Sequence, residues 1–268
     1  MNPKKTNKIT ILDLIDKKKA KGKITMLTAY DHPMAKILDE VGVDIILIGD
    51  SLGNVILGYE NTLPVTMDEM MHHTKAVSRA VKNSLIVSDM PFSAFQAGPG
   101  LAYWNASKLI SEGGANAVKI EGVENIKVIK DIIAAGIPVM GHLGFTPQSI
   151  NRLGGAKVQG RDKKSADKLI SDAKLLQKAG VFALVLELVP AQVAKKIQKA
   201  LKIPVISCGA GKYCDGQVLV INDLIGLSDK KYKFVKQYVN LSAEIKRAVA
   251  NFIMDVEMGR FPGEENSF

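Results

Sequence analysis

The stretch Asp44-Ile-Ile-Leu-Ile-Gly-Asp-Ser51 decides the fold class. Its four consecutive aliphatic residues are followed at once by a glycine and then by two polar residues, Asp50 and Ser51. A strand that is apolar at every position, rather than at alternate positions, is buried on both faces, as in a parallel sheet covered by helices. The stretch therefore predicts a buried parallel strand with polar groups at its carboxyl end.

The same unit recurs along the chain, with an apolar run, a polar or glycine-rich break and an amphipathic stretch in turn. We predict strands at residues 24–30, 44–49, 84–89, 117–121, 138–142, 182–187, 204–208 and 217–222. Helices are predicted near residues 33–41, 67–82, 101–113, 124–135, 164–179 and 191–201. Eight strands in a chain of 268 residues favour a closed (β/α)₈ TIM barrel over an open sheet. The connection between the last two strands is too short for an obvious helix.

We predict one domain spanning residues 1–268. Its expected parts are a basic N-terminal arm with a short helix (1–23), the barrel core (24–226), and a C-terminal helix and tail (227–268). The composition, 47% hydrophobic and 24% charged, is ordinary for a globular protein with a sizeable core.

The net charge of +9 is concentrated near the N-terminus. Residues 1–23 hold eight lysines and two acidic residues, a net charge of +6 that leaves +3 for the rest of the chain. A basic arm of this kind can bind nucleic acid or an anionic membrane. We interpret these lysines instead as solvated residues around a short helix, because no stripe of basic and aromatic residues accompanies them. We therefore expect no nucleic-acid partner and no membrane partner.

The expected location is the cytoplasm. The N-terminus lacks the apolar segment of a secretory signal, and the longest apolar runs are too short to span a bilayer. The two cysteines, Cys208 and Cys214, have the spacing of neither a zinc site nor a disulfide framework, which suits a reducing compartment.

Residues able to do chemistry stand at the carboxyl end of nearly every predicted strand. In a barrel these ends meet on one rim, where the active site of this fold lies. A single Asp after a strand can equally be the N-cap of the next helix, but agreement among six strands favours a site. The candidates are Asp50, Ser51, Asp89, Lys119, Glu121, His142 and Glu187.

Carboxylates from neighbouring strands, namely Asp50, Asp89 and Glu121, predict oxygen ligands for Mg²⁺ or a similar hard cation. Mg²⁺ keeps several waters and completes its shell with substrate oxygens, which an α-keto acid can supply. A cation on the keto oxygen stabilises the enolate that forms when a proton leaves the adjacent carbon. The residues alone therefore predict metal-assisted enolisation of a small keto acid.

Other candidates keep alternative interpretations. Lys119 can neutralise the substrate carboxylate or enolate oxygen, or it can be a Schiff-base lysine or an ion-pair partner of Glu121. Glu187 follows a very apolar run, which suits a partly desolvated general base, although a structural ion pair is the alternative. His142 can donate a hydrogen bond to substrate or lie satisfied in the core. The long connection 143–162 is either a binding loop or plain surface.

Several longer motifs run in order along most of the chain. They include Gly49-Asp-Ser-Leu-Gly53, Asp89-Met-Pro-Phe92, Val118-Lys-Ile-Glu-Gly122, Gly141-His-Leu-Gly144, Thr146-Pro-Gln-Ser149 and Lys157-Val-Gln-Gly-Arg161. In these segments the chain resembles the 3-methyl-2-oxobutanoate hydroxymethyltransferase (ketopantoate hydroxymethyltransferase) family. The resemblance implies a barrel of the phosphoenolpyruvate/pyruvate superfamily type. It also implies transfer of a hydroxymethyl group from 5,10-methylenetetrahydrofolate to 3-methyl-2-oxobutanoate, giving 2-dehydropantoate in pantothenate biosynthesis.

The resemblance also implies roles for single residues. Asp50 and Asp89 are the implied Mg²⁺ ligands, with Glu121 beside the metal. Glu187 is the implied proton acceptor. The implied keto-acid contacts are Asp50, Ser51, Asp89 and Lys119, to which we add His142 from its position. The family further implies a homo-oligomer, commonly a decamer.

Two other interpretations are weighed against this one. Carbon–carbon lyases and phosphoenolpyruvate mutases of the same superfamily generally carry a Lys-Lys-Cys-Gly-His-type loop, which this chain lacks. A non-catalytic nucleic-acid-binding protein would use the lysines of residues 1–23 and would bind with strong salt sensitivity. The chain departs from the family pattern at Ser207-Cys208, Leu188 and Asn222. These departures concern the folate-binding side of the site, and none is at a presumed metal ligand.

Overall fold

Eight parallel strands close into a barrel in the computed structural model of the chain, which describes residues 8–268. Each strand pairs with the next one along the chain, and the last pairs with the first to close the ring. The strands are β1 (Ile24–Thr28), β2 (Ile45–Ile48), β3 (Leu85–Asp89), β4 (Ala117–Glu121), β5 (Val139–Gly144), β6 (Ala183–Glu187), β7 (Val205–Cys208) and β8 (Gly216–Leu219). The predicted (β/α)₈ barrel is confirmed.

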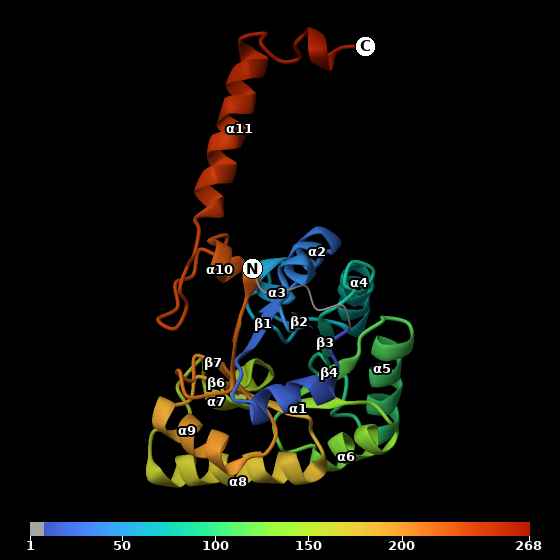
Figure 1. Cartoon of the computed structure of the whole chain (residues 1–268), viewed down its shortest axis with the longest axis vertical. Coiled ribbons are helices and arrows are strands. Elements are labelled where there is room, and N and C mark those ends of the chain that lie inside the picture. Colours follow the sequence, from blue (N-terminus) through green and yellow to red (C-terminus); the bar gives the residue numbers. More distant parts are fainter. Residues whose placement is uncertain (1–7) are drawn as a thin grey trace. The chain divides into compact units, whose positions relative to one another are not determined.

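Helices lie outside this ring of strands (Figure 1). Their apolar faces are buried against the sheet. The helix at Met67–Ser78, for example, contacts β2 and β3, and its residues Met70 and Val77 are buried. The helices up to β8 are α1 (Ile11–Lys19), α2 (His32–Val41), α3 (Leu52–Val55), α4 (Met67–Ser78), α5 (Pro99–Ser111), α6 (Ile126–Ala134), the 3₁₀ turn η1 (Pro147–Ser149), α7 (Ile150–Leu153), α8 (Lys163–Ala179) and α9 (Ala191–Ala200). Within the described part of the chain, no helix separates β7 from β8, as the short connection predicted.

The end of β8 differs from the sequence-based expectation. The strand ends at Leu219, and Asn222, which was expected to end it, lies in the helix that follows. The backbone explains this, because the carbonyl of Asn222 accepts from the amide of Leu227 at 2.8 Å instead of joining the sheet. At the start of β8, a Cβ on Gly216 would lie 2.5 Å from the carbonyl oxygen of Ile24, so glycine permits the close pairing with β1.

Helix α1 lies against the amino ends of the strands, and two of its lysines, Lys17 and Lys18, form ion pairs with residues of the barrel. Leu14 is 1% exposed and belongs to the core cluster of the barrel. Lys17 Nζ lies 2.6 Å from Asp44 Oδ2, and Lys18 Nζ lies 2.9 Å from Asp215 Oδ2. The expectation that the basic residues are simply solvated is therefore wrong for these two. Residues 1–7 of the predicted basic arm lie outside the described residues.

Contacts along the chain define two compact units, the first ending at Val220 and the second spanning Ile221–Phe268. The second unit contains α10 (Ile221–Ile225), α11 (Leu241–Glu257) and the 3₁₀ turn η2 (Glu264–Asn266). Asn240 caps α11 by accepting from the amide of Ala243. The single-domain organisation stays a prediction. Among residues 8–268, no helix is both long and apolar enough to cross a membrane.

Candidate active site

The barrel brings the polar residues at the strand ends onto one rim. Asp50 and Ser51 follow β2, while the others are strand residues: Asp89 ends β3, Lys119 and Glu121 lie on β4, His142 lies on β5, and Glu187 ends β6. The register of the parallel strands pairs Asp89 with Lys119, and Glu121 with His142. Paired positions on neighbouring strands point to the same side of the sheet, so this register places opposite charges next to each other. All the predicted site residues therefore belong to one region of the molecule.

One half of the site is built around Asp89. Its Oδ1 lies 2.9 Å from Lys119 Nζ, and its Oδ2 accepts a hydrogen bond of 3.0 Å from the backbone amide of Asp50. Lys119 therefore pairs with Asp89, not with the Glu121 partner considered as an alternative. The hydroxyls of Ser51 and Tyr30 are 2.8 Å apart and close this side of the site. A Cβ on Gly49 would lie 2.7 Å from Ser51 Oγ, so a larger residue at position 49 would clash with the Ser51 side chain in the turn after β2.

The other half is centred on His142. Its Nδ1 lies 3.2 Å from Glu121 Oε1, and its Nε2 lies 3.3 Å from Glu187 Oε2. The imidazole is 3% exposed, whereas the Glu187 side chain is 19% exposed and so is the more accessible of the two. This geometry places His142 between two carboxylates, which uses both of its ring nitrogens. Glu187 is thereby fixed at the edge of the site with part of its side chain open to solvent.

Gln148 joins the two halves, and sequence reasoning did not single it out. Its side-chain nitrogen donates to Asp50 Oδ2 at 2.8 Å and to the carbonyl of Met90 at 2.9 Å. Its backbone amide donates to Glu121 Oε2 at 3.0 Å. The residue lies in η1 of the long β5–α8 connection, within the Thr146-Pro-Gln-Ser149 motif. That motif was the available signal, but a glutamine in a loop predicts no chemistry by itself.

Burial and mutual repulsion disfavour the charged forms of the two aspartates near Lys119. The pKa of Asp50 is raised well above its ordinary value, first by burial and then by repulsion from Asp89 and Glu121. Burial also raises the pKa of Asp89, although Lys119 offsets part of the effect. Burial would lower the pKa of Lys119, but the surrounding carboxylates outweigh it and raise that pKa. The cluster thus holds more negative charge than Lys119 can neutralise.

The charge around His142 is better balanced. Burial and the Lys119 charge act to lower the pKa of His142, but Glu121 and Glu187 outweigh them and raise it to about 9. The imidazole is therefore protonated near neutral pH. Burial acts to raise the pKa of Glu121, and contacts with His142, Lys119 and the Gln148 amide outweigh it, so that pKa is lowered. Glu121 is accordingly a carboxylate held by fixed donors.

The acidic residues suit a hard cation that is only partly held by the protein. Among residues 8–268, no three His, Cys, Asp or Glu side chains are grouped closely enough to form a metal cage. Mg²⁺ does not need one, because it is commonly bound by one or two carboxylates, several waters and substrate oxygens. Asp50 and Asp89 are adjacent, buried and mutually repelling, so a divalent cation beside them would relieve their unfavourable charge. The donor set therefore fits Mg²⁺.

Comparisons with known proteins identify the family of the chain. The family model described as ketopantoate hydroxymethyltransferase matches residues 8–264. The chain belongs to the ketopantoate hydroxymethyltransferase family. It is therefore an enzyme of the transferase class, a hydroxymethyltransferase. The family resemblance inferred from the motifs is confirmed.

Curated members of the ketopantoate hydroxymethyltransferase family are similar over nearly their whole length. A 3-methyl-2-oxobutanoate hydroxymethyltransferase of Acetivibrio thermocellus is 56% identical over 98% of this chain and 93% of its own. Another, from Caldicellulosiruptor saccharolyticus, is 54% identical over 98% of this chain and 100% of its own. A third, from Thermoanaerobacter sp. (strain X514), is 53% identical over 97% and 96%.

Solved structures support the barrel type. A phosphonopyruvate hydrolase superposes with a TM-score of 0.63 at 11% identity, covering 97% of this chain and 91% of its own. A 2,3-dimethylmalate lyase, described as a member of the PEP mutase/isocitrate lyase superfamily, gives a TM-score of 0.58 at 12% identity, with 95% and 86% covered. At such low identity these similarities show the fold alone, which is the predicted barrel.

Proposed function

We propose that the enzyme transfers a hydroxymethyl group from 5,10-methylenetetrahydrofolate to 3-methyl-2-oxobutanoate, giving 2-dehydropantoate for pantothenate biosynthesis. The observation that supports this most is the division of the rim into two parts. A buried carboxylate pair lies beside Lys119, and a more exposed carboxylate, Glu187, contacts His142. The first part suits binding of an anionic keto acid, and the second suits proton transfer at the carbon next to the keto group.

The substrate-binding part has Lys119 and Ser51 as donors. In this proposal Lys119 neutralises the carboxylate or the enolate oxygen of the keto acid, and Ser51 contributes a hydroxyl donor. Asp50 and Asp89 would hold Mg²⁺, with Glu121 beside it. When bound, the cation polarises the keto oxygen and stabilises negative charge on it. Gln148 keeps the carboxylates of Asp50 and Glu121 in position.

Glu187 is the proposed general base. It accepts the proton from C3 of 3-methyl-2-oxobutanoate, and the resulting enolate carbon forms a bond to the methylene carbon of the donor. The methylene carbon loses both of its bonds to folate nitrogens, one as the carbon–carbon bond forms and the other as a water supplies the hydroxyl group. The proton taken from C3 and one proton of that water go to the two nitrogens. The products are then 2-dehydropantoate and tetrahydrofolate. In this proposal His142, as an imidazolium, orients Glu187, from which it lies 3.3 Å away. Its contact with the keto acid stays a prediction.

The direct test follows product formation by NMR with purified enzyme, ¹³C-labelled donor and 3-methyl-2-oxobutanoate. The expected result is 2-dehydropantoate labelled in its hydroxymethyl group, formed only when Mg²⁺ is present. Pyruvate, which lacks the branched C3, serves as the comparison acceptor and should react more slowly. Cleavage of the keto acid, or no labelled product with either acceptor, would contradict the proposal.

Two further expectations concern the assembly and location of the enzyme. We propose a homo-oligomer, a decamer as the family resemblance implies, that works in the cytoplasm. Light scattering of the purified protein tests the first expectation, because a decamer has ten times the mass of the 29.0 kDa chain.

A further inference from the structure

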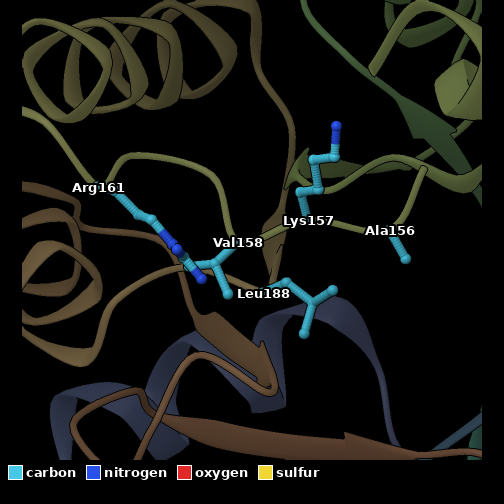
Figure 2. A pocket seen from close by; sticks show the side chains of 5 residues that line it. All are labelled: Ala156, Lys157, Val158, Arg161 and Leu188. Carbon is cyan, nitrogen blue, oxygen red and sulfur yellow. The ribbon is translucent and has the colours of Figure 1, made fainter. Parts of the chain in front are cut away.

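A pocket beside the carboxyl end of β6 is lined by none of the residues assigned to the reaction described above. It has a volume of about 400 Å³ and is lined by Ala156, Lys157, Val158, Arg161 and Leu188 (Figure 2). This volume lies within the range of small-molecule sites. Four of the five lining residues belong to the long β5–α8 connection, and the fifth directly follows Glu187.

The pocket is tied to the proposed base through the backbone. The amide of Gln159 donates to the carbonyl of Leu188 at 2.8 Å, so the connection is fixed to the residue next to Glu187. Leu188 itself has a φ of 48°, a left-handed conformation that residues other than glycine rarely adopt. The start of the same connection places Gln148 against Asp50. The connection therefore runs from the carboxylate cluster to the pocket.

The lining combines an apolar wall with two cations. In Figure 2 the Arg161 side chain extends toward Val158 and Leu188, while the Lys157 amine lies on the other side of the loop. Neither cation forms an ion pair within residues 8–268, whereas Arg152 of the same connection pairs with Glu124 at 2.5 Å. An apolar surface beside unpaired cations suits a ligand with a flat apolar group and a terminal carboxylate.

We propose that this pocket binds the p-aminobenzoyl-glutamate part of the folate donor. Arg161 pairs with a glutamate carboxylate, Lys157 adds a second, more flexible charge, and the aromatic ring packs on Val158 and Leu188. This inference rests on the proposed function. Of its two substrates, only the donor carries an anionic end separated from its reacting carbon by an aromatic linker. The keto acid is small, and Lys119 is already proposed to neutralise its negative charge.

The test compares donors with and without the glutamate. The variants are Arg161→Met and Lys157→Met, with Lys164→Met as the matched control. Lys164 is an exposed cation in the first turn of α8 that lines neither of the two pockets found in this region. The donors are 5,10-methylenetetrahydrofolate and the corresponding methylenetetrahydropteroate. Calorimetric titration with tetrahydrofolate and tetrahydropteroate measures binding without turnover.

Arg161→Met should raise the KM for the folate donor, and the Kd for tetrahydrofolate, by about tenfold, as loss of one charge-assisted contact predicts. Lys157→Met should have a smaller effect, and Lys164→Met should stay within about twofold of wild type because it removes only a distant charge. With the pteroate compounds, the Arg161→Met and control enzymes should differ from wild type by the same small factor.

Equal effects of Arg161→Met and Lys164→Met, or a loss with Arg161→Met that is as large for the pteroate donor, would overturn the pocket assignment. The activity of the wild-type enzyme distinguishes a failure of the pocket assignment from a failure of the proposed function. If it transfers no hydroxymethyl group from either donor, the proposed function is wrong. If it transfers the group and Arg161→Met binds tetrahydrofolate like wild type, the proposed function survives and the pocket assignment fails.

Discussion

Nε2 of His142 lies 3.3 Å from Oε2 of Glu187, so a buried imidazole contacts the carboxylate proposed as the general base. The other ring nitrogen lies 3.2 Å from Glu121 Oε1. An imidazole that faces a carboxylate at each nitrogen is satisfied only when both nitrogens carry a proton. The charged form of His142 thus links the proposed base to the carboxylate cluster.

The stability of the metal-free protein should therefore fall at alkaline pH. The pKa of His142 in the folded protein, raised to about 9, lies above its ordinary value of 6.5. The folded state therefore binds this proton more tightly, and the stabilisation is complete below the ordinary pKa and lost as pH rises through about 9. Urea unfolding at steps from about pH 6 to about pH 10 measures this loss relative to His142→Gln. A stability difference between the two proteins that stays constant over this range would contradict the assignment.

Gln148 should be a positioning residue for the cluster. In Gln148→Leu the side chain keeps a similar size, but Asp50 loses its amide donor. We expect Mg²⁺-dependent turnover to fall by about tenfold to a hundredfold, as for other residues that orient metal ligands. The concentration of Mg²⁺ needed for half-maximal rate should rise with it. An unchanged Mg²⁺ dependence together with a reduced rate would show that Gln148 acts elsewhere.

Two neighbouring lysines of α1 should differ sharply in their contribution to stability. Lys18 is 11% exposed and contacts Asp215 Oδ2 and the carbonyl of Ile203, at 2.9 and 2.7 Å. Lys18→Met leaves the Asp215 carboxylate buried without its cation, so we expect a loss of about 2 to 3 kcal/mol in the free energy of unfolding. Lys19 is 70% exposed, and Lys19→Met should cost less than about 0.5 kcal/mol. Chemical denaturation checks both values, and equal losses would refute the view that α1 is locked to the barrel.

Asp39 should be a structural anchor for the segment before β3. Its carboxylate is buried and accepts hydrogen bonds from the backbone amides of Lys82, Asn83 and Ser84 at 3.0, 2.9 and 2.7 Å. Asp39→Ala leaves these amides without their acceptor, and we expect a loss of about 3 kcal/mol in unfolding free energy. Glu40→Ala, at an exposed position next to it, should cost less than about 0.5 kcal/mol. Similar melting temperatures for the two variants would contradict this role.

The barrel could be predicted from sequence because its strands are apolar at every position. The bounds of β4, at 117–121, are those expected from the sequence, since an apolar run and a polar end mark both limits. The end of β8 was missed because Val220 and Ile221 continue the apolar pattern although the backbone has already turned into a helix. Apolar character alone does not distinguish a strand from the first turn of a buried helix.

The common location of the candidate residues was predictable from the sequence, but the pairing between them was not. Asp89, Glu121 and Glu187 end their strands, where the fold itself gives polar residues a common location. The partner of Lys119 depends on the register between β3 and β4, which pairs it with Asp89. The contacts of Gln148 with Asp50, and of the α1 lysines with the barrel, were not predicted for a related reason. Their partners are far away in sequence, and no local pattern specifies them.

The proposed reaction depends most directly on Glu187 as the base. Deuterium exchange at C3 of 3-methyl-2-oxobutanoate, followed by NMR without folate, measures this step alone. Wild-type enzyme should catalyse the exchange only with Mg²⁺. Glu187→Gln should lower the exchange rate by at least about a hundredfold, because the general base is lost, while the protein still folds and binds Mg²⁺. Exchange that survives in Glu187→Gln at the wild-type rate would contradict the assignment of Glu187 as the base.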